Sequence, residues 1–329
     1  MKISYYLANG KTVDQVDIQK FFIQKVSTSS YSPDETLLPH ESDSFYFPGD
    51  EIFYTLDLEC VSLYDILRDK IFPDSDEYYS FFKSTPIWMT SAGHNSDFVL
   101  SQKDFEKMVN DLHMEKHYRL LFLEDCNALI SYLQNRIIGS KARFIQFFVS
   151  FCEYEPIAMK ENGVFWASGE DTTVVFSLLN DLVITLYSIL DLITKVAFQF
   201  ENIPGNFSSY PRQKALKVLY GDRKKLRKMF SEDTLFEDTP ILKLLENLRH
   251  ELIHNGSWES VPKLFYTVEG GEVKEKWIFL QDEVNGNLVA YKNRRRFFSK
   301  GVKMNQRLPS ICMEFWSRLL STILELKTP

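Results

Sequence analysis

The chain has 329 residues and the composition of a soluble globular protein, with 44% hydrophobic and 25% charged residues. Its formal net charge of -7 argues against simple, charge-driven binding to nucleic acid. The charge is uneven, because residues 1–110 carry 9 Lys and Arg against 18 Asp and Glu, whereas the remainder carries 29 against 27. An anionic partner is therefore expected to contact the second part of the chain, and the acidic N-terminal region is a candidate surface for a protein partner.

The cysteines and the apolar stretches predict a cytoplasmic protein. The four cysteines are far apart and form no C-x-x-C motif, which is typical of reduced thiols. The N-terminus lacks the apolar core of a signal peptide. The most apolar stretch, 174–196, contains Asn180, Asp181 and Asp191, and each aspartate costs roughly 2.5–3.5 kcal/mol at the centre of a bilayer. This stretch is predicted to be a buried helix, so no membrane partner is expected.

Residues 1–100 are predicted to form a mixed α/β region of unknown role. Their Tyr, Ile and Phe content indicates strands, and their clusters of Ser, Pro and Asp indicate loops. The predicted elements are strands at 2–8 and 51–59, a loop at 27–50, a helix at 61–72, and a boundary loop at 91–97.

Residues 101–329 are predicted to form a helical domain with a β insertion at about 263–291. Apolar residues recur at helical spacing, and Thr239-Pro240 and Gly256 have the chemistry of a helix start and a helix stop. The insertion alternates and carries Gly-Gly and Asn-Gly turns, which are typical of a small antiparallel sheet. The predicted helices cover 101–133, 142–152, 171–201, 212–230, 239–255 and 306–326, and the one at 212–230 has a candidate break at Gly221-Asp222.

The stretch LRHELIHNGSW, residues 248–258, allows two interpretations. His250, Glu251 and His254 form H-E-x-x-H, in which the histidines bind zinc and the glutamate acts as general base. Catalytic zinc needs three protein ligands, but His254 is the last histidine of the chain, and the following segment is predicted to be loop and strand. A zinc metallopeptidase is therefore the third choice for the function.

Plotting the predicted helix 239–255 on a helical wheel places its functional side chains on different faces. At 100° per residue, the leucines form a buried stripe, and Arg249 leans toward it. His250 and His254 share the polar side. Arg249 should therefore find a partner, because an unpaired buried charge is costly.

The second interpretation rests on Arg249 and His254 with four residues between them, followed by Asn255-Gly256. This R-x4-H pattern at the end of a late helix resembles the signature of the HEPN family, whose fold is a bundle of four or five helices. The resemblance covers roughly residues 103–256. It implies a HEPN-like helical bundle and RNA cleavage without a metal or other cofactor, in which the 2′-hydroxyl attacks the adjacent phosphate.

The resemblance implies a role for each motif residue. His254 is expected to exchange the proton, since imidazole titrates near roughly pH 6.5, and Arg249 to bind phosphate through its planar fork. His250 and Asn255 are expected to orient the phosphate or the catalytic histidine. Because Arg249 and His254 are about 140° apart on a straight helix, the site is expected to need a homodimer, as in HEPN proteins.

Two basic stretches are candidates for holding RNA, because Lys and Arg neutralise phosphates and nearby aromatic rings stack on bases. One precedes the motif and the other follows the predicted sheet. The RNA-binding residues predicted there are Lys224, Lys225, Arg227, Arg294, Arg295 and Arg296.

The favoured function is a metal-independent RNA endonuclease, with a defence or toxin–antitoxin role that the family suggests. A non-catalytic HEPN module that binds a nucleotide, an RNA or a protein partner is the alternative. The sequence identifies neither the RNA target nor an antitoxin.

Overall fold

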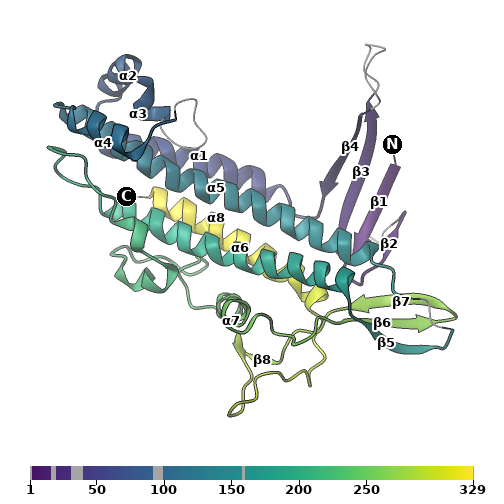
Figure 1. The fold of residues 1–329 in the computed structure, drawn as a ribbon. Helices are drawn as coiled ribbons and strands as arrows, with labels where there is room; N and C mark the ends of the chain where they lie inside the picture. The colour runs from purple at the N-terminus through teal and green to yellow at the C-terminus, as the bar shows by residue number, and fades with distance from the viewer. Residues whose placement is uncertain (1, 16–19, 31–39, 92–98, 158–159, 329) are drawn as a thin grey trace. The chain divides into compact units, whose positions relative to one another are not determined.

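The computed structural model describes residues 2–15, 20–30, 40–91, 99–157 and 160–328, and the protein is mainly α-helical (Figure 1). A mixed N-terminal region and a small antiparallel sheet near the C-terminus accompany the helices, which confirms the predicted mainly α fold with a C-terminal sheet. The α-helices are α1 (Ile52–Ile71), α2 (Ser75–Ser84), α3 (Ile87–Ser91), α4 (Gln102–Asn110), α5 (Glu115–Glu153), α6 (Glu170–Glu201), α7 (Pro240–Asn255) and α8 (Met304–Lys327).

The chain forms two compact units, and each unit combines three separate segments. The boundaries between them fall inside α1, α5, α6 and α8 and in the loop before α7, so neither unit is a continuous stretch of sequence. The boundary loop predicted at 91–97 lies almost wholly outside the described residues. The first unit is Met1–Tyr54, Ile137–Tyr187 and Glu237–Leu319, and the second is Thr55–Arg136, Ser188–Phe236 and Leu320–Pro329.

The first unit contains the described strands, in two antiparallel sheets and a small hairpin. One sheet has the order β2-β1-β3-β4, and the other has the order β5-β6-β7. The hairpin is β8-β9. The strands are β1 (Lys2–Leu7), β2 (Thr12–Val13), β3 (Phe22–Ser30), β4 (His40–Tyr46), β5 (Gly163–Ala167), β6 (Leu264–Glu269), β7 (Glu272–Trp277), β8 (Glu283–Val284) and β9 (Asn287–Leu288).

The β predictions were partly right. The strand at 2–8 and the sheet at 263–291 are confirmed. The loop at 27–50 was wrong, because β3 ends at Ser30 and β4 spans His40–Tyr46. Both strands contain several Ser residues, a composition that favours loops. They are strands nevertheless, because β3 and β4 pair with each other in antiparallel register.

An aromatic cluster forms the core of the first unit. The ring centroid of Trp316 on α8 lies 4.7 Å from that of Phe53 and 5.4 Å from that of Phe144 on α5. The indole Nε1 of Trp316 donates to the hydroxyl of Ser140 at 3.0 Å, so its one polar atom is satisfied. This cluster fixes α5 against α8 within the unit.

In the second unit, α1 lies beside α5 (Figure 1). The hydroxyl of Tyr64 on α1 donates to Gln134 on α5 at 2.7 Å, and the Gln134 amide donates to Asp57 at 3.0 Å. The strand predicted at 51–59 was wrong, because α1 begins at Ile52 and also includes the helix predicted at 61–72. The buried residues of α1 recur every three or four positions, a helical period that outweighs the β-favouring residue types: Phe53, Leu56, Cys60, Leu63, Leu67 and Ile71.

Three other predicted helices differ from those of the structure. The helix at 101–133 is two helices, α4 and α5, and α5 continues through the segment predicted as a separate helix at 142–152. Ser101 caps α4 as expected, since its hydroxyl accepts from the backbone N–H of Asp104. Residues 212–230 form no α-helix but two short 3-10 helices, η1 (Ala215–Lys217) and η2 (Tyr220–Lys225). Gly221 and the closely spaced charges give this segment no continuous apolar stripe.

Helix α6 is long and apolar enough to cross a membrane by length and composition, and it is the one such helix in the described part of the chain. Half of its most apolar window is buried within the protein. This agrees with the prediction of a buried helix at 171–201. The four cysteines are free and buried.

The two predicted turns of the C-terminal β segment are confirmed. Gly270 and Gly271 have φ values of 62° and 79° between β6 and β7. Asn285 and Gly286 have φ values of 51° and 80° between β8 and β9. Two successive positive φ angles define the hairpin turn that Gly-Gly and Asn-Gly favour.

Gly286→Ala is expected to destabilise the protein by about 3 kcal/mol. A Cβ atom on Gly286 would lie 2.1 Å from the carbonyl oxygen of Pro240 at the start of α7, in addition to the strain of a positive φ. Gly271→Ala is the matched control, because its φ is 79° and its Cβ would meet nothing within 4 Å. Urea denaturation should show a loss of only about 1 kcal/mol for the control. Equal losses would contradict close packing of this turn on α7.

Candidate functional site

The site is built on α7 in the first unit, and the sequence prediction of this helix is confirmed. The hydroxyl of Thr239 accepts from the backbone N–H of Leu242 at 3.4 Å, and Pro240 occupies the first turn. The helix ends at Asn255, and Gly256 has a φ of 81° that favours glycine. The motif residues therefore occupy the last two turns of a well-capped helix.

The two histidines share an exposed face of α7, as predicted. His250 and His254 are exposed, and their ring centroids are 4.5 Å apart. The opposite side is buried through Leu245, Leu248 and Leu252. The imidazoles are thus accessible to a ligand that approaches this face.

Arg249 lies on another face of the helix and is half-buried. Its guanidinium carbon is 4.9 Å from the centroid of the Tyr187 ring on α6. The predicted partner of this arginine is therefore an aromatic face, which attracts a cation through its quadrupole. The structure does not bring Arg249 and His254 of one chain together on one surface.

Glu251, the glutamate of H-E-x-x-H, is a buried residue with 7% exposure. Its carboxylate accepts from the amide of Asn255 at 2.9 Å and lies 3.8 Å from the guanidinium of Arg295. The described residues contain no group of three or more His, Cys, Asp or Glu side chains that could hold a metal ion. Within this part of the chain, the zinc interpretation has two histidines and no third ligand.

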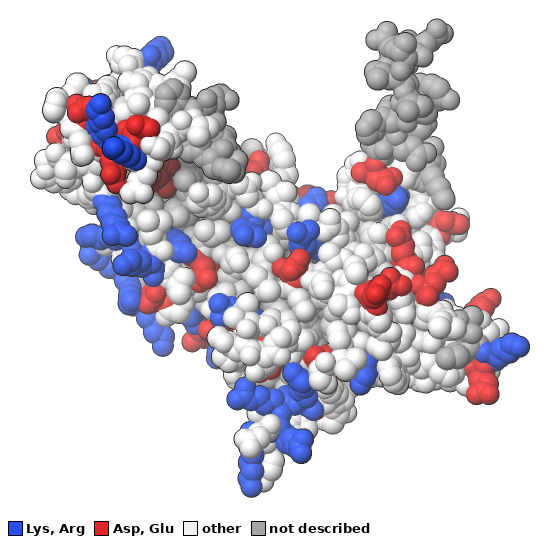
Figure 2. Space-filling model, viewed as in Figure 1, with Lys and Arg blue, Asp and Glu red and all other residues white. Residues whose placement is uncertain are grey.

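The arginines predicted to bind RNA at 294–296 lie beside the end of α7. Arg296 donates to the backbone carbonyl of Ser257 at 3.0 Å, just beyond the helix. Figure 2 shows Lys and Arg gathered over the part of the chain that lies beyond β8 in Figure 1. A pocket of about 850 Å³ lies between this loop and the helix, lined by Glu251, Asn255, Asn293, Arg294, Arg295, Arg296 and Phe297.

Local hydrogen bonds hold the loop at residues 291–300, which contains Arg294, Arg295 and Arg296 and which we call the arginine loop. Tyr291 and Arg294 exchange backbone hydrogen bonds of 2.8 and 2.9 Å, which closes a tight turn. The Asp282 carboxylate accepts from the hydroxyl of Ser299 at 2.6 Å and from the backbone N–H of Lys300 at 2.9 Å. These hydrogen bonds lower the pKa of Asp282, so the anchor is charged at neutral pH.

The other predicted RNA-binding residues, Lys224, Lys225 and Arg227, belong to the second unit. Lys225 forms an ion pair with Asp222 at 2.7 Å, and all three side chains are exposed. They are therefore not part of the pocket at α7.

Sequence reasoning missed two residues that shape the site. Tyr187 is more than sixty positions before Arg249, and no spacing rule connects them. Glu251 was considered only as a general base, although its place near the edge of the leucine stripe was a signal that it could be buried.

Comparisons of this chain with models of protein families, with curated proteins and with solved structures find no match.

Proposed function

We propose that this protein is a metal-independent RNA endonuclease with a HEPN-like site at the end of α7. One observation carries the proposal: Asn255 of the R-x4-H segment lines the same pocket as Arg294, Arg295 and Arg296. Three guanidinium groups next to the helix that presents the exposed histidines form a surface suited to the RNA backbone.

The proposed reaction is the transfer of a phosphoryl group within the RNA strand. His254 accepts the proton of a ribose 2′-hydroxyl, whose oxygen then bonds to the adjacent phosphorus while the bond to the 5′-oxygen breaks. The leaving 5′-oxygen takes up a proton from water, and the products end in a 2′,3′-cyclic phosphate and a 5′-hydroxyl. Arginine guanidinium groups stabilise the charge on the phosphate oxygens.

The two faces of α7 make a homodimer part of this proposal. Arg249 lies against Tyr187, whereas His254 lies on the exposed face with His250. A second copy of the chain can supply Arg249 to the site that contains His254 of the first copy. We also propose a cytoplasmic location and a toxin or defence role, which the sequence and the family resemblance support.

The test is to incubate the purified protein with mixed RNA in excess EDTA and to identify the ends of the products. Cleavage in EDTA is expected, since no step needs a metal. The products should end in 2′,3′-cyclic phosphates, because the 2′-hydroxyl is the attacking group. Addition of zinc to a chelator-treated sample is the control. Peptide hydrolysis or RNA cleavage that requires zinc would contradict the proposal.

RNA binding without cleavage is the second candidate, and the position of Arg249 favours it. This guanidinium is half-buried on an aromatic ring, so phosphate binding requires it to leave that contact. An intact RNA that co-elutes with the protein in EDTA would support this alternative.

A further inference from the structure

The first part of the segment between α6 and α7, residues 203–228, is strongly basic and belongs to the second unit. Residues 203–228 contain eight Lys and Arg but a single acidic residue, Asp222. Figure 2 shows Lys and Arg gathered over this segment, which Figure 1 draws in green. So high a positive charge in an acidic protein suggests an anionic ligand.

Acidic residues of the neighbouring helices hold this segment in place. Asp191 on α6 accepts from the backbone N–H of Tyr220 at 2.8 Å, and Asp125 on α5 accepts from the hydroxyl of Tyr210. Glu201 accepts from the backbone N–H groups of residues 227 and 228 at 2.8 and 2.9 Å. Among the described residues, none of these three carboxylates forms an ion pair with a basic side chain.

Three adjoining pockets lie where this segment meets α5 and α6 in the second unit, with volumes of about 480, 420 and 500 Å³. Tyr132 lines the first and the second pocket, and Pro211 and Arg212 line the second and the third. We call the three together the basic groove. It runs from the middle of α5 and α6 to the loop after Glu201.

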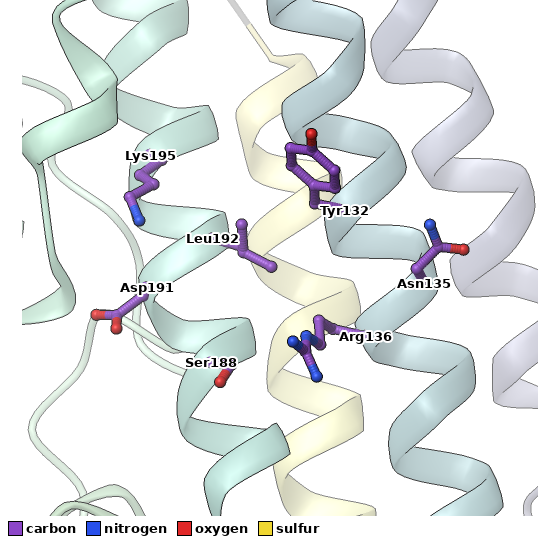
Figure 3. A pocket seen from close by; sticks show the side chains of 7 residues that line it. All are labelled: Tyr132, Asn135, Arg136, Ser188, Asp191, Leu192 and Lys195. Carbon is purple, nitrogen blue, oxygen red and sulfur yellow. The ribbon is translucent and has the colours of Figure 1, made fainter. Parts of the chain in front are cut away.

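Figure 3 shows the first pocket of the basic groove, between α5 and α6. Tyr132 and Arg136 come from α5, whereas Lys195 comes from α6. Tyr132 is 57% exposed, which leaves much of its ring accessible. A flat ring between two pockets is a platform on which a base can stack.

Five basic side chains line the basic groove: Arg136, Lys195, Arg212, Lys214 and Arg227. Within the described part of the chain, none of these five forms an ion pair. Two other lysines of the segment have partners, since Lys225 pairs with Asp222, and Lys228 donates to two backbone carbonyls of the C-terminal segment. The cations of the groove are therefore available to an external anion.

We propose that the basic groove binds single-stranded RNA. Its cations neutralise successive phosphates, and Tyr132 stacks on an unpaired base. A duplex offers no free base face to this ring, so single strands are preferred. The groove binds RNA whether or not α7 cleaves it, so this inference does not rest on the nuclease proposal.

The test compares two triple variants of the full-length protein. Arg136→Gln/Lys195→Gln/Arg212→Gln removes three cations of the groove. The matched control, Lys83→Gln/Lys103→Gln/Lys107→Gln, removes three exposed cations of the same unit outside the groove. Fluorescence anisotropy measures binding of a labelled oligouridylate of about 15 nucleotides and of a matched duplex RNA.

The groove variant is expected to bind the single strand at least about tenfold more weakly than wild type and to have a shallower salt dependence. The control should stay within about twofold of wild type, and wild type should prefer the single strand to the duplex. Equal weakening by both triple variants, an equal affinity for duplex, or no binding of the oligouridylate by wild type would overturn the proposal.

Tyr132 supplies a second test that does not depend on charge. Tyr132→Leu is expected to weaken binding about fivefold or more, whereas Tyr132→Phe keeps the ring and the affinity. The residue is more than half exposed, so neither change should unfold the protein, and melting temperatures check this. Equal affinities of Tyr132→Leu and Tyr132→Phe would show that the ring of Tyr132 does not stack on a base.

Cleavage assays separate this inference from the nuclease proposal. If α7 cleaves RNA, the groove variant should still cut a dinucleotide, which is too short to need the groove. Loss of oligouridylate binding with intact dinucleotide cleavage supports the groove. Binding that persists in the groove variant rejects it, whatever the nuclease activity.

Discussion

An Arg249→Ala chain and a His254→Ala chain are each expected to be inactive alone and to recover about a quarter of the wild-type nuclease activity when mixed as equal partners. Removal of the proton-transfer group should lower the rate about 100- to 10,000-fold, and removal of the phosphate-binding cation about 100- to 1,000-fold. A mixed dimer has one site without either group and one complete site. Half of the dimers are mixed, which leaves a quarter of the sites complete.

The measurement is RNA cleavage after the two chains have been co-refolded, with each variant refolded alone as the reference. His113→Ala is the matched control, because His113 is exposed and belongs to the second unit. It should keep the wild-type rate. Failure of the mixture to recover would place Arg249 and His254 in the same site of one chain, and full activity of both single variants would reject the proposed nuclease.

Neutralising the arginine loop with Arg294→Gln/Arg295→Gln/Arg296→Gln is expected to weaken RNA binding about 10- to 100-fold and to reduce the salt slope by about three units. The reason is that these side chains line the pocket beside Asn255. At saturating RNA, the cleavage rate should fall only a few-fold, since the loop holds the substrate and does not exchange the proton. Binding titrations at several salt concentrations, together with kcat and KM, measure these effects.

The control for this variant is Lys20→Gln/Lys160→Gln/Lys274→Gln, which removes the same charge from other surfaces of the first unit. Its affinity for RNA should stay close to that of wild type. If the two triple variants lose the same affinity, net charge rather than the pocket at α7 determines binding. Thermal melting checks that loss of the Arg296 hydrogen bond to Ser257 has not unfolded the loop.

The structure changed the interpretation of one residue of the motif, Glu251. The helical wheel placed His250 and His254 on the polar face and Arg249 nearer the leucines, and both placements agree with the structure. The wheel did not reveal that Glu251 is buried against Asn255 and Arg295. A glutamate held in this way is a positioning group, which weakens its assignment as the base of a zinc site.

Errors in the fold prediction had a common origin, because residue type was given more weight than period or pairing. Residues 51–59 have strand-favouring Ile, Phe and Tyr but bury Phe53, Leu56 and Cys60 at helical spacing. The basic run at 212–230 has helix-favouring Lys and Arg but no apolar stripe to pack as an α-helix. Its conformation is instead held by the carboxylates of Asp191 and Glu201, which accept hydrogen bonds from its backbone N–H groups.

The sequence by itself determined the bounds of α7, the exposed face of its histidines and the turns at Gly271 and Gly286. Caps, turns and the helical period act between residues at most about four positions apart, so they can be read from the chain. Only the tertiary structure decided that β5 pairs with β6, that Tyr187 contacts Arg249, and that Arg294–Arg296 lie beside Asn255. These residues are about forty or more positions apart, and they meet only because the packing of buried side chains places their elements together.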